Sequence, residues 1–180
     1  MAGTVLWHTT MSLDGFIAGP DDAMDWAFGN GRPGPIAEQV IEATGAVLAG
    51  RRGYDLGTRP GPGPRGIYGG RWSGPVFVLT HRPPEAGQQD GIRFLSNGIR
   101  DAVATAAAAG GRSLGIFGAS IARQCLQHGL LDEIVVHLVP VLLGDGVRMY
   151  EAPGGKPVRL ERTEQYDTGQ ITDLRFRVLK

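Results

Sequence analysis

The chain has 180 residues, and its 18 Lys and Arg residues balance 18 Asp and Glu residues, so the formal net charge at pH 7 is zero. Proteins that bind nucleic acids or anionic membranes usually carry a basic surplus, so this balance argues against both kinds of partner. The 29 glycines and 12 prolines approach the share found in disordered chains, but a hydrophobic content of 42% favours a folded protein. The length predicts one domain over residues 1–180.

The cysteine content and the N-terminal residues bear on the cellular compartment. The single cysteine, Cys125, excludes an intrachain disulfide and is typical of a reducing compartment. Residues 1–10 lack a charged region followed by an apolar run, and no stretch approaches the roughly 18 apolar residues of a membrane span. We therefore expect a cytoplasmic protein with no membrane segment.

Apolar runs along the chain predict strands that alternate with helices, followed by two strands in succession. The turn Asp167-Thr-Gly169 between the last two strands predicts an antiparallel hairpin. The predicted fold is an α/β domain with a mostly parallel sheet and an antiparallel C-terminal edge. In chain order the predicted elements are a strand at 5–11, a loop at 19–34, a helix at 35–43, a strand at 46–49, a glycine-rich loop at 57–74, strands at 76–79 and 92–95, a helix at 99–109, a strand at 114–117, a helix at 121–128, and strands at 133–143, 158–166 and 171–179.

Three local signals set expectations about where these elements begin and end. Gly45 is predicted to end the first helix, and Ser96 or Asn97 to cap the helix at 99–109. Pro140 lies inside a predicted strand, and a proline there indicates an edge strand or a bulge.

Two segments share the pattern of a short apolar strand, a glycine turn and a helix start. Free backbone N–H groups and the helix dipole favour anions at such a turn, and a small residue lets a phosphate approach closely. Adjacent arginines at a helix start are electrostatically disfavoured unless an anion lies nearby, although ordinary solvated cations and a tight packing turn are the alternatives. The two turns are Gly50, Arg51, Arg52 and Gly53, and Gly118, Ala119, Ser120 and Ile121; Thr80, His81 and Arg82 form a third polar strand end.

Other kinds of site find no support in the sequence. The four histidines (His8, His81, His128 and His137) show no metal-ligand spacing, so we expect no metal, and a structural role for each is the default. The chain has no G-x-S-x-G sequence, which argues against a hydrolase of that type. Neither fixed-spacing phosphate fingerprint is present.

Six strings occur in an order that is typical of one family. They are residues 11–18 (MSLDGFIA), 50–54 (GRRGY), 76–84 (VFVLTHRPP), 118–121 (GASI), 130–134 (LLDEI) and 137–144 (HLVPVLLG). From end to end the chain resembles the dihydrofolate reductase-like proteins related to the C-terminal reductase domain of riboflavin biosynthesis. The resemblance implies a three-layer α/β/α fold, NADPH as cofactor, and a homodimer.

The resemblance also implies how the cofactor lies. Arg51 matches the position that grips the 2′-phosphate, while Arg52 and Gly53 match N–H donors to the pyrophosphate. The strand end at 80–82 matches the adenosine half, and the turn at 118–121 matches the pyrophosphate. Three residues of the first-strand region match the lining of the nicotinamide: Thr10, Ile17 and Ala18.

The substrate half is implied with fewer residues. Asp14 is the leading candidate for the catalytic polar contact, although an Asp-Gly pair after a strand is equally typical of a simple turn. Asp25, Trp26 and Glu38 are candidates for substrate binding. The chain departs from the riboflavin-type pattern at Ile116, where that family carries a glutamate. The resemblance implies hydride transfer to a C=N or C=O carbon of a small heterocycle or carbonyl compound; a non-catalytic protein that binds NADPH or a heterocycle is the alternative.

Overall fold

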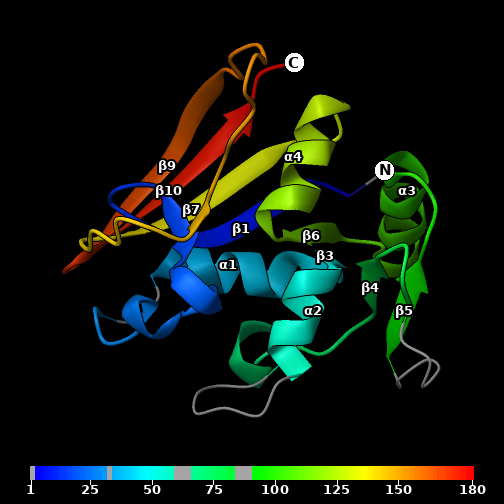
Figure 1. The fold of residues 1–180 in the computed structure, drawn as a ribbon, viewed down its shortest axis with the longest axis horizontal. Helices are drawn as coiled ribbons and strands as arrows, with labels where there is room; N and C mark the ends of the chain where they lie inside the picture. Colours follow the sequence, from blue (N-terminus) through cyan, green and yellow to red (C-terminus); the bar gives the residue numbers. More distant parts are fainter. Residues whose placement is uncertain (1–2, 32–33, 59–65, 84–90) are drawn as a thin grey trace.

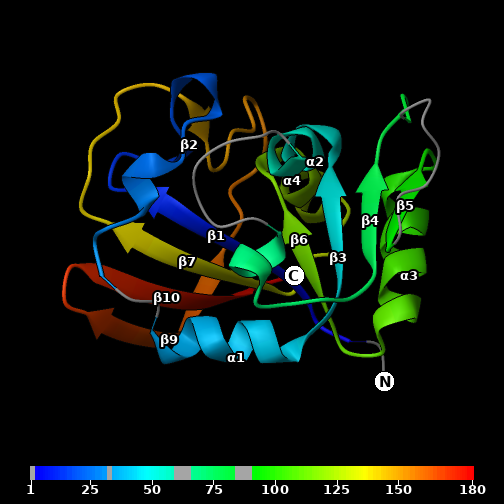
Figure 2. The ribbon, with the colours of Figure 1, turned by 90° about the horizontal axis from the view of Figure 1, so that it is seen from below.

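Eight strands form one sheet whose order is β5-β4-β3-β6-β1-β7-β10-β9, seen from end to end in Figure 2. The computed structural model describes residues 3–31, 34–58, 66–83 and 91–180. A separate two-stranded sheet pairs β2 with β8. The strands are β1 (Val5–Ser12), β2 (Phe16–Ala18), β3 (Thr44–Gly50), β4 (Val76–Leu79), β5 (Ile92–Leu95), β6 (Ser113–Phe117), β7 (Glu133–Val139), β8 (Val147–Arg148), β9 (Leu160–Thr168) and β10 (Ile171–Val178).

The sheet is parallel except at its C-terminal end. β1 runs parallel to β6 and β7, and β3 runs parallel to β4 and β6, while β10 is antiparallel to both β7 and β9. The predicted mostly parallel sheet with an antiparallel C-terminal hairpin is therefore confirmed. Because β3, β4, β5 and β6 point the same way, their carboxyl ends lie along one edge of the sheet.

Helices cover both faces of the sheet, which confirms the predicted three-layer fold (Figure 1). Side chains alternate across β1, so Trp7 packs with α3 and α4 on one face and Leu6 packs with α1 on the other. Cys125 is buried on the α4 side, and burial raises the pKa of its thiol to about 12. The helices are α1 (Pro35–Ala43), α2 (Arg51–Thr58), α3 (Ile99–Gly110) and α4 (Ala119–Gln127), with short 3₁₀ turns η1 (Pro20–Asp22), η2 (Asp25–Ala27) and η3 (Ile67–Gly70).

Gly45 does not end the first helix as predicted. α1 ends at Ala43, and Gly45 already lies in β3. A Cβ atom on Gly45 would lie 2.5 Å from the carbonyl oxygen of Gly110, and one on Gly110 would lie 2.7 Å from the carbonyl carbon of Gly45. The physical requirement at Gly45 is therefore a close crossing of two backbones, where the end of α3 passes the start of β3.

Other boundaries differ from the predictions for local reasons. β7 is an interior strand that ends at Val139, because Pro140 cannot donate to the ladder and so stops the strand before residue 143. α3 has Gly98 at its N-cap and no side-chain cap hydrogen bond, so Ser96 and Asn97 do not cap it. Within the predicted loop at 57–74, α2 extends to Thr58 and η3 occupies 67–70, while residues 59–65 lie outside the described residues.

Among the described residues, no helix is both long and apolar enough to cross a bilayer.

Candidate functional site

A cavity of about 490 Å³ opens at the carboxyl ends of β3, β4 and β5. In a parallel α/β sheet this edge is where ligands bind, because strand ends and helix starts meet there. Its wall combines the turn after β3, the polar strand ends and the first turns of α3 and α4. The lining residues are Gly50, Arg51, Arg52, Leu79, Thr80, His81, Ser96, Asn97, Gly98, Ile99, Ser120, Ile121 and Gln124.

The two predicted glycine turns meet at this cavity. A Cβ atom on Gly50 would lie 3.3 Å from Cγ1 of Ile121, so the backbone at the end of β3 closely approaches the first turn of α4. Gly118 has a φ of +93°, a conformation that residues with a Cβ adopt only under strain. Glycine is therefore required at Gly50 by a close contact and at Gly118 by the shape of its turn.

The electrostatic character of the cavity favours an anion. Arg51, Arg52 and His81 line it, and its lining residues include no Asp or Glu. The N-cap of α4, Gly118, makes no side-chain cap hydrogen bond, so first-turn N–H groups of that helix keep their donor capacity. Two helix N-termini and two arginines therefore direct positive charge toward the same space.

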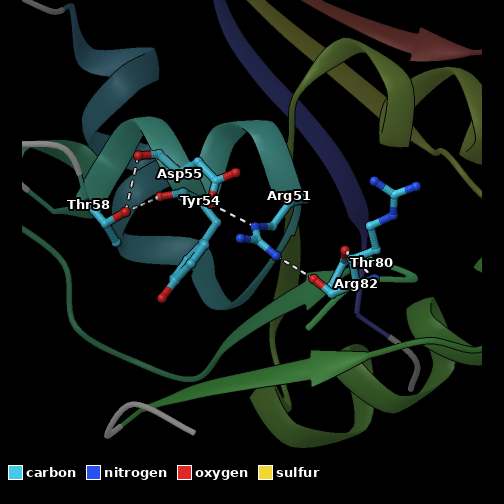
Figure 3. A network of polar contacts seen from close by, with 6 residues as sticks. All are labelled: Arg51, Tyr54, Asp55, Thr58, Thr80 and Arg82. Atoms are coloured by element: carbon cyan, nitrogen blue, oxygen red, sulfur yellow. Dashed lines mark hydrogen bonds and ion pairs between the residues drawn. The ribbon is translucent and has the colours of Figure 1, made fainter. Parts of the chain in front are cut away.

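Arg51 is held in place from two sides (Figure 3). Its Nε donates a hydrogen bond to Oδ1 of Asp55, one turn later in α2, at 2.7 Å. Its Nη1 donates to the backbone carbonyl oxygen of Arg82, just beyond the end of β4. The backbone N–H of Arg82 in turn donates to Oγ1 of Thr80 at 3.1 Å, which fixes the strand end. The guanidinium is thus oriented at the cavity wall, with its Nη2 not used in these contacts.

Arg52 points toward a different partner. Its Nε donates to Oδ1 of Asp22 at 2.6 Å, and Asp22 belongs to the η1 turn that follows the first strand region. Asp22 adopts a φ of +64°, which is uncommon for a residue with a side chain. The ion pair connects the loop after β2 to the start of α2.

The cavity unites half of the predicted cofactor residues. Seven of them line it directly: Gly50, Arg51, Arg52, Thr80, His81, Ser120 and Ile121. Gly53 lies one position further along α2, Arg82 lies just past β4, and Gly118 and Ala119 begin α4. Thr10 lies in β1, and Ile17 and Ala18 lie in β2; these three do not line this cavity.

Residues at the end of β5 escaped the sequence reading as site candidates. Ser96, Asn97 and Gly98 line the cavity, although the sequence suggested only a helix-capping role for the first two. They follow β5 as Thr80 follows β4, so the rule that parallel strands expose their carboxyl ends together is the signal that identifies them. Gln124, one turn into α4, gave no such signal.

Asp14 is tied into the chain by its own carboxylate. Its oxygens accept hydrogen bonds from the Ser12 hydroxyl at 2.6 Å, the Gly144 N–H at 2.7 Å and the Leu143 N–H at 3.0 Å. The Ser12 hydroxyl foremost, and then these two N–H groups, lower the pKa of Asp14 to about 2. The carboxylate therefore links the β1–β2 turn to the loop after β7, and these contacts favour the turn reading over the catalytic one, which stays a prediction.

The three predicted substrate residues lie on separate elements. Asp25 and Trp26 belong to η2, where the Trp26 indole Nε1 donates to the carbonyl oxygen of Ala23 at 3.0 Å. Glu38 lies on α1 and accepts a hydrogen bond from Arg71, whose guanidinium lowers the pKa of that carboxyl. No hydrogen bond among the described residues joins Glu38 to Asp25 or Trp26, and their role in substrate binding remains a prediction.

Within the described ranges, no group of three or more His, Cys, Asp or Glu side chains is arranged to hold a metal ion.

Comparison with known proteins agrees with this architecture. A curated relative, the uncharacterized protein YwjB of Bacillus subtilis, is 25% identical over 185 residues, covering 96% of each chain. Among solved structures, the deaminase/5-amino-6-(5-phosphoribosylamino)uracil reductase of Thermotoga maritima superposes with a TM-score of 0.70 at 14% identity, covering 99% of this chain and 57% of that one. The dihydrofolate reductase of Enterococcus faecalis, complexed with NADP(H), superposes with a TM-score of 0.64 at 14% identity, covering 100% and 99%.

These structural matches show that the fold is that of dihydrofolate reductase and of riboflavin-type reductase domains. The family model described as the RibD C-terminal domain matches residues 70–172, which is more than half of the chain. The protein belongs to the RibD C-terminal domain family.

Proposed function

We propose that this protein is an NADPH-dependent reductase that transfers hydride to a small heterocyclic substrate, pterin-like or pyrimidine-like, or to a carbonyl compound. One observation carries the proposal. The cavity at the carboxyl edge of the sheet joins the Gly50 turn, the Thr80 strand end and the start of α4 around Arg51 and Arg52. Family membership supports the same class of reaction.

The lining residues fit a dinucleotide phosphate. A pyrophosphate needs N–H donors and close backbone approach, and the N-termini of α2 and α4 with Gly50 between them offer both. A 2′-phosphate needs an oriented guanidinium, and Arg51 is held at the cavity wall by Asp55 and by the carbonyl of Arg82. Because the cavity lining has no carboxylate, two further negative charges meet no repulsion from it.

The protein's share of the reaction is binding and orientation. NADPH, when bound, supplies the hydride, and the chain holds the acceptor carbon close to the nicotinamide. We assign the nicotinamide wall to Thr10, Ile17 and Ala18, on β1 and β2. We assign the substrate side to Asp25, Trp26 and Glu38, because η2 packs against β1 and α1 covers the sheet beneath it.

A fluorescence titration tests the cofactor assignment. Purified protein is titrated with NADPH and with NADH, and we expect NADPH to bind at micromolar concentrations and more tightly than NADH. Absence of binding by either nucleotide would contradict the proposal. NADPH oxidation is then followed with dihydrofolate, 5-amino-6-(5-phosphoribosylamino)uracil, benzoquinone and benzaldehyde as probes. Tight NADPH binding without oxidation in a wider set of these four classes would favour a non-catalytic binding protein.

We further propose that the protein is a cytoplasmic homodimer. The absence of a membrane-spanning helix among the described residues is compatible with this location. Light scattering coupled to size-exclusion chromatography measures the mass in solution. A mass near twice the 19.1 kDa of the chain is expected, and a mass of one chain would contradict the dimer.

A further inference from the structure

Four polar side chains form a hydrogen-bonded row across the α1 face of the sheet. His137 on β7 and Asp173 on β10 are joined by a 2.5 Å contact between Nδ1 and Oδ1. The Nε2 atoms of His8, on β1, and His137 contact each other, so one of the two must carry a proton. Nδ1 of His8 lies 3.3 Å from the hydroxyl of Tyr68 in η3. The row runs from a carboxylate to a phenol through two imidazoles.

Asp173 anchors one end of the row. Its side chain is 0% exposed, and its Oδ2 has no hydrogen-bond partner among the described residues. A Cβ atom on Gly34 would lie 2.4 Å from that oxygen, so the carboxylate abuts the residue that caps the N-terminus of α1. The positive end of the α1 dipole and the proton on His137 Nδ1 both favour the ionised carboxylate. A buried anion therefore holds His137 in place.

The charges around His8 decide where the shared proton lies. Burial foremost, and then the neighbouring His137 and Arg175, lower the pKa of His8 to about 3, so its ring is neutral at ordinary pH. Arg175 on β10 is itself paired with Glu133 at 3.3 Å and Glu164 at 2.9 Å. When the two rings hold three protons, the positive charge belongs on His137, next to Asp173.

This placement gives the row a direction. With His137 doubly protonated, its Nε2–H donates to Nε2 of His8, and the remaining His8 proton on Nδ1 donates to the Tyr68 oxygen. The Tyr68 O–H is then free to donate outward. In the opposite arrangement, the Tyr68 O–H donates to His8 Nδ1 and the His8 Nε2–H donates to His137. The two arrangements differ by one proton and need no movement of the rings.

The outer end of the row lies next to the cofactor turn. The rings of Tyr68 and Phe117 meet edge-on with centroids 5.4 Å apart. Phe117 is the last residue of β6 and directly precedes Gly118, where the second glycine turn begins. The phenol is thus connected by one side-chain contact to the strand that carries the proposed pyrophosphate site.

We propose that Tyr68, His8, His137 and Asp173 form a proton relay that completes reduction at the substrate. The inference rests on the proposed function, in which NADPH transfers hydride to a C=N or C=O carbon. The π electrons of that bond then form an N–H or O–H bond with the Tyr68 proton. Tyr68 takes the Nδ1 proton of His8, and His8 takes the Nε2 proton of His137. His137 becomes neutral, Asp173 stays ionised, and solvent later restores one proton.

The relay can be tested in the free protein without any substrate. Long-range ¹H–¹⁵N correlation spectra report which imidazole nitrogens carry protons, and they are recorded between about pH 4 and pH 9. We expect His8 and His137 to lose one proton as a pair, with His8 changing from the Nδ1–H to the Nε2–H tautomer as that proton leaves. Independent titration of the two rings, or a single His8 tautomer throughout, would overturn the relay.

Paired tyrosine substitutions test the relay during turnover. Tyr68→Phe removes the hydroxyl but keeps the ring against Phe117. Tyr54→Phe is the matched control, because Tyr54 meets Phe94 edge-on at 5.2 Å and lies outside the row. With the fastest-reduced probe of the oxidation screen, we expect Tyr68→Phe to lower kcat on the order of 10²-fold while leaving the Kd for NADPH within about twofold. Tyr54→Phe is expected to retain wild-type kcat.

The pH profile adds a readout that a structural tyrosine would not change. Because the relay must hold its proton, wild-type kcat should fall as pH rises, and Tyr68→Phe should lose that dependence. Wild-type turnover and an unchanged profile in Tyr68→Phe would overturn the relay while leaving the reductase proposal intact. Absence of NADPH binding and of oxidation in the wild-type protein would instead overturn the proposed function.

Discussion

Nε of Arg51 donates a hydrogen bond to Oδ1 of Asp55 at 2.7 Å, so the arginine proposed to bind the 2′-phosphate is oriented by a carboxylate of its own helix. The same guanidinium reaches the backbone carbonyl of Arg82 beyond β4. Three directions of the guanidinium fork can thus serve three different partners: α2, the strand end and a phosphate. A lysine has no such planar fork.

Arg51→Ala is expected to weaken NADPH binding by about 10- to 100-fold, the worth of charge-assisted hydrogen bonds to one phosphate. NADH, which lacks the 2′-phosphate, should lose far less. Arg51→Lys should give an intermediate loss, because it keeps the charge but cannot hold both protein contacts. Fluorescence titration measures all of these constants, with Arg162→Ala on the exposed edge strand β9 as control. Equal losses for NADPH and NADH would contradict the assignment.

Gly50→Val is expected to weaken NADPH binding at least about 10-fold, because its Cβ would lie 3.3 Å from Ile121 Cγ1 and its methyl groups would occupy the cavity. Gly57→Val is the matched control, since a Cβ at Gly57 meets nothing within 4 Å. Titration with NADPH and thermal unfolding are measured on both variants. If Gly50→Val binds NADPH as the wild type does, the phosphate does not approach this turn.

Asp14→Asn is expected to lower the melting temperature at neutral pH, because the amide cannot accept all the hydrogen bonds that the carboxylate accepts from Ser12, Leu143 and Gly144. The pKa of Asp14 is lowered to about 2 in the folded protein, so the carboxylate's contribution is present above its unfolded pKa of about 4. It is lost as pH falls from about 4 to 2.

Thermal unfolding across that pH range measures the effect. The difference in melting temperature between wild type and Asp14→Asn should be constant above about pH 5 and should shrink below pH 4. If instead Asp14→Asn unfolds like the wild type at neutral pH but loses turnover with unchanged NADPH binding, Asp14 acts in catalysis.

Gly110→Ala is expected to reduce the free energy of unfolding by about 1–3 kcal/mol, because the new Cβ would lie 2.7 Å from the carbonyl carbon of Gly45 and 2.8 Å from the N atom of Ala46. Gly53→Ala is the matched helical control, since a Cβ there meets nothing within 4 Å and alanine favours helix by about 1 kcal/mol. Urea unfolding should therefore show opposite signs for the two variants. Equal stabilisation by both would contradict the close crossing of α3 and β3.

The amino-acid sequence by itself determined the element order, the sheet type and half of the cofactor cavity. Local signals sufficed there, because strand, glycine turn and helix start are adjacent in the chain, as in the run from Gly50 to Gly53. The carboxyl-edge rule for parallel strands then brings Thr80 and Ser120 to the same place without further information.

Only the tertiary structure decided the contacts between residues distant in the chain. Gly45 looked like a helix stop, and its actual requirement comes from Gly110, which is 65 positions away in the sequence. His8 and His137 showed no metal-ligand spacing, yet adjacent strands β1 and β7 bring their rings together, and β10 adds Asp173. Strand register is set by the packing of the whole sheet, so a row of side chains that crosses three strands leaves no pattern in any one of them.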